Sequence, residues 1–185
     1  MCGIVGYIGK QDASPIIIEG LRRLEYRGYD SAGICTLNGG EPQIRRAEGK
    51  LINLENILRE QPAEGIRGIG HTRWATHGEP SQQNAHPHCC HQGKIAVVHN
   101  GIIENHEVLR AELIEKGYEF ASETDTEVVV HLIDTYLKPG ISLLDAVNLA
   151  TKDLTGAYAL GVIAKDDPDT LVAVREGSPL VLGSG

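Results

Sequence analysis

The sequence predicts a layered α+β fold, in which helices and antiparallel strands occupy separate layers of one domain. Along the 185 residues, the expected strands and helices do not alternate strictly. The strands are indicated by apolar runs and the helices by apolar positions at helical spacing. A doubly wound parallel sheet would require that alternation. Neither a Gly-x-Gly-x-x-Gly pattern nor a phosphate-binding loop is present, which counts against a nucleotide-binding fold.

The first half of the chain predicts two helices among strands. Residues 2–8 form a short apolar run typical of a buried strand. Ser14 and Pro15 indicate a helix start, and apolar spacing extends that helix to about Tyr26. The remaining expected elements are a strand at 34–37, a hairpin turn at Gly39-Gly40, a helix from about Leu51 that ends near Pro62, and a strand over 68–74.

The second half begins with a long loop, residues 75–93, of a length that is usually functional. A strand at 95–98 follows, and it is expected to stop at His99-Asn100-Gly101. A helix with Val108, Leu109 and Leu113 inward should end at Gly117. The further expected elements are strands at 118–121, 157–164, 170–174 and 180–182, and helices that begin near 122–125 and at Ser142.

Composition narrows the classes of function. The net charge of −8 argues against a nucleic-acid-binding surface, which would be basic. No apolar run is long enough to cross a membrane, and no secretory leader is recognisable, so we expect a cytoplasmic protein. The four cysteines lack the spacing of a disulfide framework and are expected to stay reduced.

Cys2 directly follows the initiator methionine. If Met1 is removed, Cys2 carries a thiol and a free α-amino group, whose ordinary pKa values are roughly 8.5 and 7.7–8.0. The amine is then a base beside a nucleophile that needs one. Taken alone, Cys2 could equally be whatever residue happened to follow the start codon.

Three polar clusters occupy expected strand ends or helix starts. Arg73 could bind a carboxylate through two hydrogen bonds, but the sequence does not distinguish this from an ordinary surface arginine. Asn100 and the N–H of Gly101 could together bind one oxyanion, whereas Asn-Gly is also the strongest short signal for a hairpin turn. The acidic run at 123–127 could bind an ammonium group or simply complement a helix dipole.

A histidine- and cysteine-rich stretch raises the alternative of a zinc-binding interaction domain. Adjacent cysteines rarely chelate one tetrahedral ion, and no second ligand pair has finger-like spacing. We therefore expect no metal and no cofactor. The residues of this alternative are His86, His88, Cys89, Cys90 and His91.

Five motifs, in order along nearly the whole chain, resemble those of the class II glutamine amidotransferases. The resemblance is stronger still to the glutaminase domains of the glutamine–fructose-6-phosphate aminotransferases. The motifs are Cys-Gly-Ile-Val-Gly from Cys2, Tyr-Arg-Gly-Tyr-Asp-Ser-Ala-Gly from Tyr26, His-Thr-Arg-Trp-Ala-Thr-His-Gly-Glu-Pro from His71, His-Asn-Gly-Ile-Ile-Glu-Asn from His99, and Ser-Glu-Thr-Asp-Thr-Glu from Ser122.

The resemblance implies a four-layer αββα sandwich of the N-terminal-nucleophile hydrolases. It implies that Cys2 attacks the side-chain amide of L-glutamine while its α-amino group relays the proton. Asn100 and the Gly101 N–H would hold the oxyanion, Arg73 the substrate carboxylate and Asp125 its ammonium group. Trp74, on a loop that closes over glutamine, and Thr76, His77 and His86 would line the pocket.

The resemblance also bears on extent and partners. We expect residues 1–185 to form one amidotransferase domain that is incomplete at its C-terminal end, without sugar-isomerase domains. Fructose 6-phosphate would meet the ammonia only through those domains, and the full-length enzyme would be a homo-oligomer. A domain of another ammonia-channelling enzyme, such as an amidophosphoribosyltransferase, is the alternative within the class.

Overall fold

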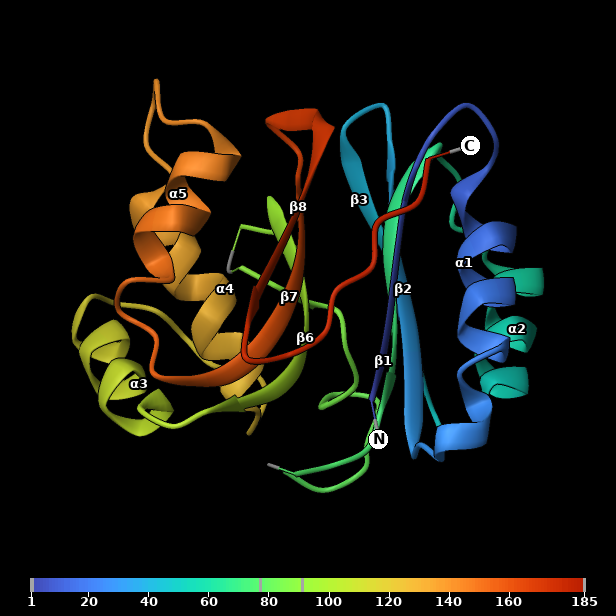
Figure 1. Cartoon of the computed structure of the whole chain (residues 1–185), viewed down its shortest axis with the longest axis horizontal. Helices are drawn as coiled ribbons and strands as arrows, with labels where there is room; N and C mark the ends of the chain where they lie inside the picture. The colour runs from blue at the N-terminus through green and yellow to red at the C-terminus, as the bar shows by residue number, and fades with distance from the viewer. Residues whose placement is uncertain (1, 77, 91, 185) are drawn as a thin grey trace.

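The computed structural model describes residues 2–76, 78–90 and 92–184, which form four layers (Figure 1). Two antiparallel sheets stack face to face, and helices cover both outer faces, so the predicted αββα sandwich is confirmed. The N-terminal sheet, in the order β1-β4-β2-β3, contains β1 (Gly3–Ile8), β4 (Arg67–Arg73), β2 (Ser31–Asn38) and β3 (Glu41–Glu48). The C-terminal sheet, in the order β5-β6-β7-β8, contains β5 (His88–Cys89), β6 (Ile95–Ile103), β7 (Gly156–Ala164) and β8 (Asp167–Glu176).

Helices α1 (Ala13–Arg22) and α2 (Leu51–Glu60) cover the N-terminal sheet, and a short 3₁₀ helix spans Glu25–Arg27. Helices α3 (His106–Glu115), α4 (Asp125–Tyr136) and α5 (Leu143–Ala150) form the layer outside the C-terminal sheet. Among the described residues, no helix has the length and apolar character to cross a membrane.

Three buried clusters hold the layers together. Each sheet packs its outer face on its helices, through residues such as Ile17 and Leu54 on one side and Val129 and Ile133 on the other. The layer between the sheets is thinner. Its buried members are Cys35, Leu37, Ile69, Ala96, Val98 and Ile163.

Several predicted local signals are confirmed. Gly39 and Gly40 take positive φ angles of 57° and 89° in the turn between β2 and β3, where glycine has no steric cost. The Ser142 hydroxyl accepts a hydrogen bond from the Asp145 N–H, which caps α5. Gly117 follows α3 with a φ of 89°.

Other predictions are wrong in detail. Asp12, not Ser14, stands at the N-cap of α1, and Ser14 lies inside the helix. Residues 118–121 and 180–182 form no strand, and Val181 is 90% exposed. Val108 is exposed on α3, because only Leu109 and Leu113 of the predicted apolar face point inward. Apolar content alone had suggested the two strands. Tyr118 and Phe120 instead pack on the buried cluster of the C-terminal half without joining a strand.

Candidate active site

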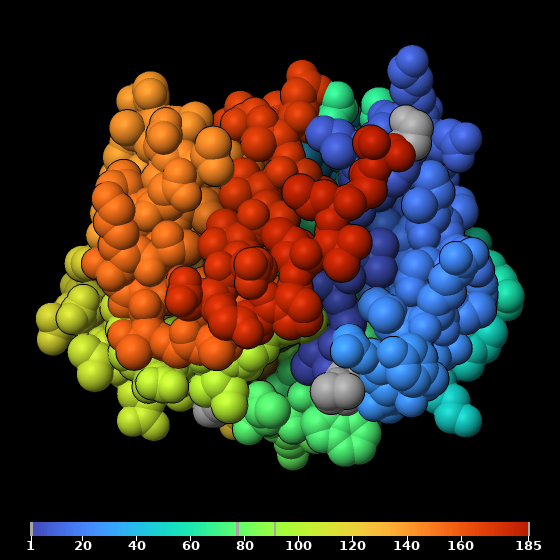
Figure 2. Space-filling view, viewed as in Figure 1, coloured from blue at the N-terminus to red at the C-terminus, as the bar shows by residue number. Residues whose placement is uncertain are grey.

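A pocket of about 810 Å³ lies between the two sheets. All the predicted site residues that the structure describes contribute to its wall, whereas the predicted His77 lies outside the described residues. Much of the remaining wall is apolar, and residues 178–182 pass over it. Figure 2 shows this C-terminal segment, in red, lying across the seam between the halves. The predicted residues in the wall are Cys2, Arg73, Trp74, Thr76, His86, Asn100, Gly101 and Asp125.

Strand alternation brings these side chains together. Ile4, Ile69 and Val98 all contribute to the layer between the sheets. Side chains two residues apart on a strand share a face. Cys2 therefore lies on the same face as Ile4, and Asn100 on the same face as Val98. Arg73, four residues beyond Ile69, lies on the same face as well. The Cys2 thiol and the Asn100 amide therefore come from different sheets and meet across the gap.

The Cys2 thiol is held by the main chain of Trp74. The Trp74 N–H donates to Sγ at 3.2 Å, and Sγ lies 3.5 Å from the Trp74 carbonyl oxygen. Burial raises the pKa of the Cys2 thiol, and the hydrogen bond from the Trp74 backbone only partly offsets that effect. The sulfur is therefore mostly a neutral thiol near pH 7 and needs a base before it can attack.

Asn100 reaches across the gap to the start of β1. Its Nδ2 donates to the Cys2 carbonyl oxygen at 3.4 Å, and its Oδ1 lies 2.8 Å from His71 Nε2. A hairpin turn at Asn100-Gly101, weighed from sequence, is wrong. Strand β6 continues through both residues to Ile103 and pairs with β7.

Gly101 is required at its position. Its φ is 118°, and a Cβ there would lie 2.1 Å from the Ala157 carbonyl oxygen. No residue with a side chain fits without moving β7. The backbone next to Asn100 is consequently fixed at the edge of the pocket.

Arg73 is buried at the end of β4, and its guanidinium contacts two main-chain carbonyls. Its nitrogens lie 3.2 Å from the Gly78 oxygen and 3.5 Å from the Glu79 oxygen. Both contacts are long for charge-assisted hydrogen bonds. A carboxylate in the pocket would be a stronger partner for this cation.

Asp30 holds the chain on either side of Trp74. Its carboxylate accepts from the Ala75 N–H at 2.6 Å, and its own N–H donates to the Arg73 carbonyl at 2.7 Å. Trp74 itself is 53% exposed and lies beside Gly28, where a Cβ would be 3.2 Å from the indole ring. The loop that includes Gly28 and Asp30 thus supports the segment that holds the thiol.

Asp125 begins α4 and is buried at the pocket wall. Its Oδ2 accepts from the Ile103 N–H at 3.0 Å, and its Oδ1 lies 3.8 Å from His99 Nδ1. The capping residue Thr124 accepts from the Glu127 N–H at 3.3 Å. A carboxylate at a helix N-terminus is stabilised there and could attract an ammonium group.

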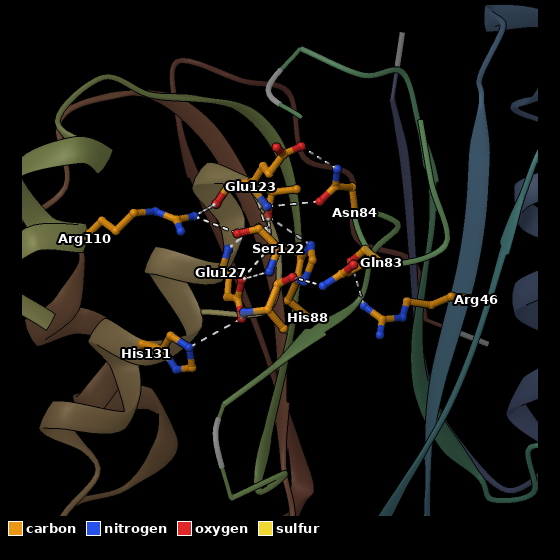
Figure 3. A network of polar contacts seen from close by, with 11 residues as sticks. Arg46, Gln83, Asn84, His88, Arg110, Ser122, Glu123, Glu127 and His131 are labelled. Carbon is orange, nitrogen blue, oxygen red and sulfur yellow. Dashed lines mark hydrogen bonds and ion pairs between the residues drawn. The ribbon is translucent and has the colours of Figure 1, made fainter. Parts of the chain in front are cut away.

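A buried polar network, drawn in Figure 3, fixes the start of α4. The Glu127 carboxylate accepts from the Ser122 N–H and hydroxyl, both at 2.6 Å, and from the Ala121 N–H at 2.8 Å. Burial alone would raise its pKa, but the hydrogen bonds outweigh burial and lower it to about 2. Asn84 joins the loop before β5 to this network, because its amide pairs with the Glu123 N–H and carboxylate.

Four buried histidines lie between the site and this network. The ring of His86 lies 4.3 Å from that of His71 and 5.0 Å from that of His88, centroid to centroid. Burial lowers the pKa of His71 and of His88 to about 3, and that of His86 well below its usual range. These three imidazoles are therefore neutral at physiological pH. The fourth is His99.

The described residues contain no group of three or more His, Cys, Asp or Glu side chains that could hold a metal ion. Of the residues of the zinc alternative, His91 lies outside the described residues. His88 Nε2 lies 3.0 Å from the Thr124 hydroxyl. Burial raises the pKa of the Cys89 thiol to about 12 and also raises that of Cys90, which disfavours the thiolate that zinc requires.

Sequence reasoning assigned no role to His71 or Asp30. Both lie in motifs that the resemblance quoted, so the motifs pointed to the region without assigning these side chains. His71 also precedes Arg73 by two residues in an expected strand. Alternation could therefore have placed both side chains on one face.

Comparison with known proteins identifies the family. Residues 71–183, more than half of the chain, match the glutamine amidotransferase domain. The whole chain is 59% identical to a glutamine–fructose-6-phosphate aminotransferase (isomerizing) of Clostridium perfringens and 56% identical to one of Zymomonas mobilis. It spans about 30% of the length of each of these relatives.

Solved structures agree on the fold. The glutamine phosphoribosylpyrophosphate amidotransferase of B. subtilis, in complex with ADP and GMP, is 27% identical, with a TM-score of 0.75 over 89% of this chain and 35% of that one. A second structure, described as the allosteric regulatory enzyme of purine biosynthesis, is 28% identical, with a TM-score of 0.77 over 89% of this chain and 36% of the other. The family match and this shared fold together place the chain in the glutamine amidotransferase domain family.

Proposed function

We propose that this chain is a glutaminase that hydrolyses L-glutamine to glutamate and ammonia, with Cys2 as the nucleophile. The observation that carries the proposal is the meeting of Cys2 and Asn100 across the gap, in one pocket with Arg73 and Asp125. Glutamine carries one carboxylate, one ammonium group and one neutral amide. Arg73, Asp125 and the pair of Cys2 and Asn100 match these three groups in charge and in hydrogen-bonding capacity.

In the proposed reaction, the α-amino group of processed Cys2 takes the thiol proton as the sulfur attacks the amide carbon of glutamine. Asn100 Nδ2 and the Gly101 N–H donate to the oxyanion of the tetrahedral intermediate. The proton then passes to the leaving nitrogen, ammonia departs, and a γ-glutamyl thioester remains. Water attacks that thioester through a second oxyanion and releases glutamate.

Removal of Met1 is a condition of this mechanism. In the unprocessed chain the nitrogen of Cys2 is part of an amide, which is not a base near neutral pH. The raised pKa of the Cys2 thiol makes that base necessary. Trp74, Thr76, His77 and His86 complete the proposed glutamine pocket, and no cofactor takes part.

The names of the close relatives suggest where the ammonia goes. We propose that residues 1–185 act as an amidotransferase domain that supplies ammonia for the conversion of fructose 6-phosphate to glucosamine 6-phosphate. A longer cytoplasmic, homo-oligomeric enzyme would perform the sugar chemistry. A role in phosphoribosylamine synthesis is the second candidate, favoured by the shared fold, but identity is 27% there against 59% for the first candidate.

The proposal is tested by intact-mass spectrometry after incubation with an electrophilic glutamine analogue. The expected result is loss of Met1 and a single adduct on Cys2, with no adduct in Cys2→Ala. An adduct on Cys35, Cys89 or Cys90 instead, or glutamine turnover by a chain that retains Met1, would refute the mechanism.

A further inference from the structure

We infer that His71 is a positioning residue that sets the orientation of the Asn100 side-chain amide and so builds the proposed oxyanion site. The inference rests on the proposed function, and it concerns a residue to which that mechanism assigns no step. His71 lies on β4 of the N-terminal sheet, whereas Asn100 lies on β6 of the opposite sheet. Their contact is a polar bridge between the two sheets, beside the apolar cluster that contains Ile69 and Val98.

An asparagine amide has two faces with opposite roles. With Nδ2 toward the site, Asn100 donates a hydrogen bond to an oxyanion; if it were flipped, Oδ1 would repel that oxyanion. The backbone of β6 does not decide between these orientations, because both have the same shape. The hydrogen-bond partners at the two ends of the amide must therefore decide.

Two partners agree on one orientation. At the site end, the Cys2 carbonyl oxygen lies 3.4 Å from Nδ2 and can only accept. At the other end, His71 Nε2 lies 2.8 Å from Oδ1, so a neutral imidazole with its proton on Nε2 donates there. The opposite tautomer would set the lone pair of Nε2 against that of Oδ1. It would also leave Asn100 Oδ1 without the hydrogen bond from His71.

The surroundings of the His71 imidazole keep it neutral. His71 is fully buried, and its ring packs on that of His86 at 4.3 Å. Burial lowers its pKa to about 3, although the hydrogen bond with Asn100 acts in the opposite direction. The His71 imidazole therefore stays neutral, with its proton on Nε2, over the pH range in which the enzyme would work. The orientation of the Asn100 amide does not change with pH over that range.

The test compares His71→Leu, which removes the donor, with His71→Gln, whose amide nitrogen can still donate to Oδ1. Removing one oxyanion donor lowers kcat roughly 10²–10³-fold. Loss of the hydrogen bond from His71 that orients the donor Asn100 should therefore lower kcat about 10–100-fold, with little change in KM. His71→Gln should recover most of that loss. Alkylation of Cys2 by iodoacetamide forms no oxyanion, so its rate should be retained in both variants.

Two comparisons separate positioning from mere stability. His131→Leu removes another buried imidazole, on α4 away from the pocket, and should lower Tm while keeping kcat. The double variant His71→Leu/Asn100→Ala should be no slower than Asn100→Ala, because the two residues act as one unit. A kcat unchanged in His71→Leu, an equal loss of alkylation rate, or additive losses in the double variant would each overturn the inference.

The tautomer is measured separately, by ¹⁵N NMR of the imidazole nitrogens in the wild-type chain. A proton on Nε2 of His71, with a shift that moves in Asn100→Ala, is the expected result; a proton on Nδ1 overturns the inference. This readout does not need turnover. If the wild type failed to hydrolyse glutamine, the proposed function would fail while the orientation of Asn100 was still decided.

Discussion

The two sides of the pocket are held in different ways. On the nucleophile side, Cys2 and Arg73 contact main-chain groups at 3.2–3.5 Å. On the acid side, at the start of α4, Glu127 accepts hydrogen bonds of 2.6–2.8 Å from Ser122 and Ala121, and Asp125 accepts one of 3.0 Å from Ile103. The hydrogen bonds at the start of α4 are therefore shorter than these contacts of Cys2 and Arg73. In the proposed function, the nucleophile side would gain further partners from glutamine.

The first prediction removes the centre of the nucleophile side. Cys2→Ala should lower glutamine turnover roughly 10⁴-fold or more, since Cys2 is the only cysteine among the described residues of the pocket wall. Tm should change little, because the half-buried thiol makes only main-chain contacts. Ammonia release and thermal unfolding measure the two quantities.

Cys89→Ala is the matched control for this variant. Cys89 lies on β5 and is not among the residues of the pocket wall. Its turnover should match that of the wild type. A comparable loss of turnover in Cys89→Ala would mean that the thiol chemistry had been assigned to the wrong cysteine.

The second prediction concerns the residue that bridges the two sides. Asn100→Ala should lower kcat about 10²–10³-fold and leave KM nearly constant, because in the proposed mechanism the charge that Asn100 binds exists only in the transition state. Steady-state kinetics at varied glutamine concentration separates the two parameters. An effect on KM alone would make Asn100 a substrate anchor.

The third prediction contrasts one charge from each side. Arg73→Lys keeps the charge but loses bidentate geometry, so KM for glutamine should rise roughly tenfold. Asp125→Asn should raise KM by a similar factor and also lower Tm, because Asp125 is part of the chain's own hydrogen bonding. If both variants left Tm unchanged, the comparison between the two sides would fail.

The fourth prediction is the smallest and concerns stability. Glu127→Gln should cost about 1.5–3 kcal/mol of unfolding free energy at pH 7, since it weakens hydrogen bonds to a buried carboxylate. The pKa of Glu127 is lowered from 4.5 to about 2, so the stabilisation is complete above pH 4.5 and is lost as the pH falls toward 2. Urea unfolding at pH 7 and pH 3 should therefore show a smaller difference between variant and wild type at pH 3.

The exposed Glu115, at the end of α3, provides the control. Glu115→Gln should leave the unfolding free energy within about 0.5 kcal/mol of wild type at both pH values. A difference that grew on acidification in Glu127→Gln would contradict the assigned direction of the pKa shift.

Much of the fold could be predicted because local signals agreed with the final packing. The apolar faces of α2 and α4 pack on the buried clusters of their own halves, and the turn at Gly39-Gly40 joins the paired strands β2 and β3. The strand predicted at 118–121 was wrong because this segment pairs with no strand in the described part of the chain, although Tyr118 and Phe120 pack on a buried cluster. Tyr118 to Ala121 have the apolar content of a strand, yet they run toward the Ser122 network and find no sheet edge to join.

The identity of the candidate site residues could be predicted from the sequence, but the contacts between them could not. Motifs identified Cys2, Arg73, Asn100 and Asp125, and all four line one pocket. The contact between His71 and Asn100 was not predictable, because it joins strands of different sheets that are 29 positions apart in sequence. Nor could a local reading of Asn-Gly anticipate that β7 would pair with both residues and that the strand would continue through them.

The meeting of Cys2 and Asn100 across the gap also bears on folding. The N-terminal sheet with α1 and α2 is built from the first 73 residues, and the C-terminal sheet begins at His88. Each half has its own buried cluster and could collapse before the halves dock. Neither half alone carries both the Cys2 thiol and the Asn100 amide. The recovery of enzyme activity in a refolding experiment would therefore report the docking of the two halves. It should follow the spectroscopic signals of helix and strand formation.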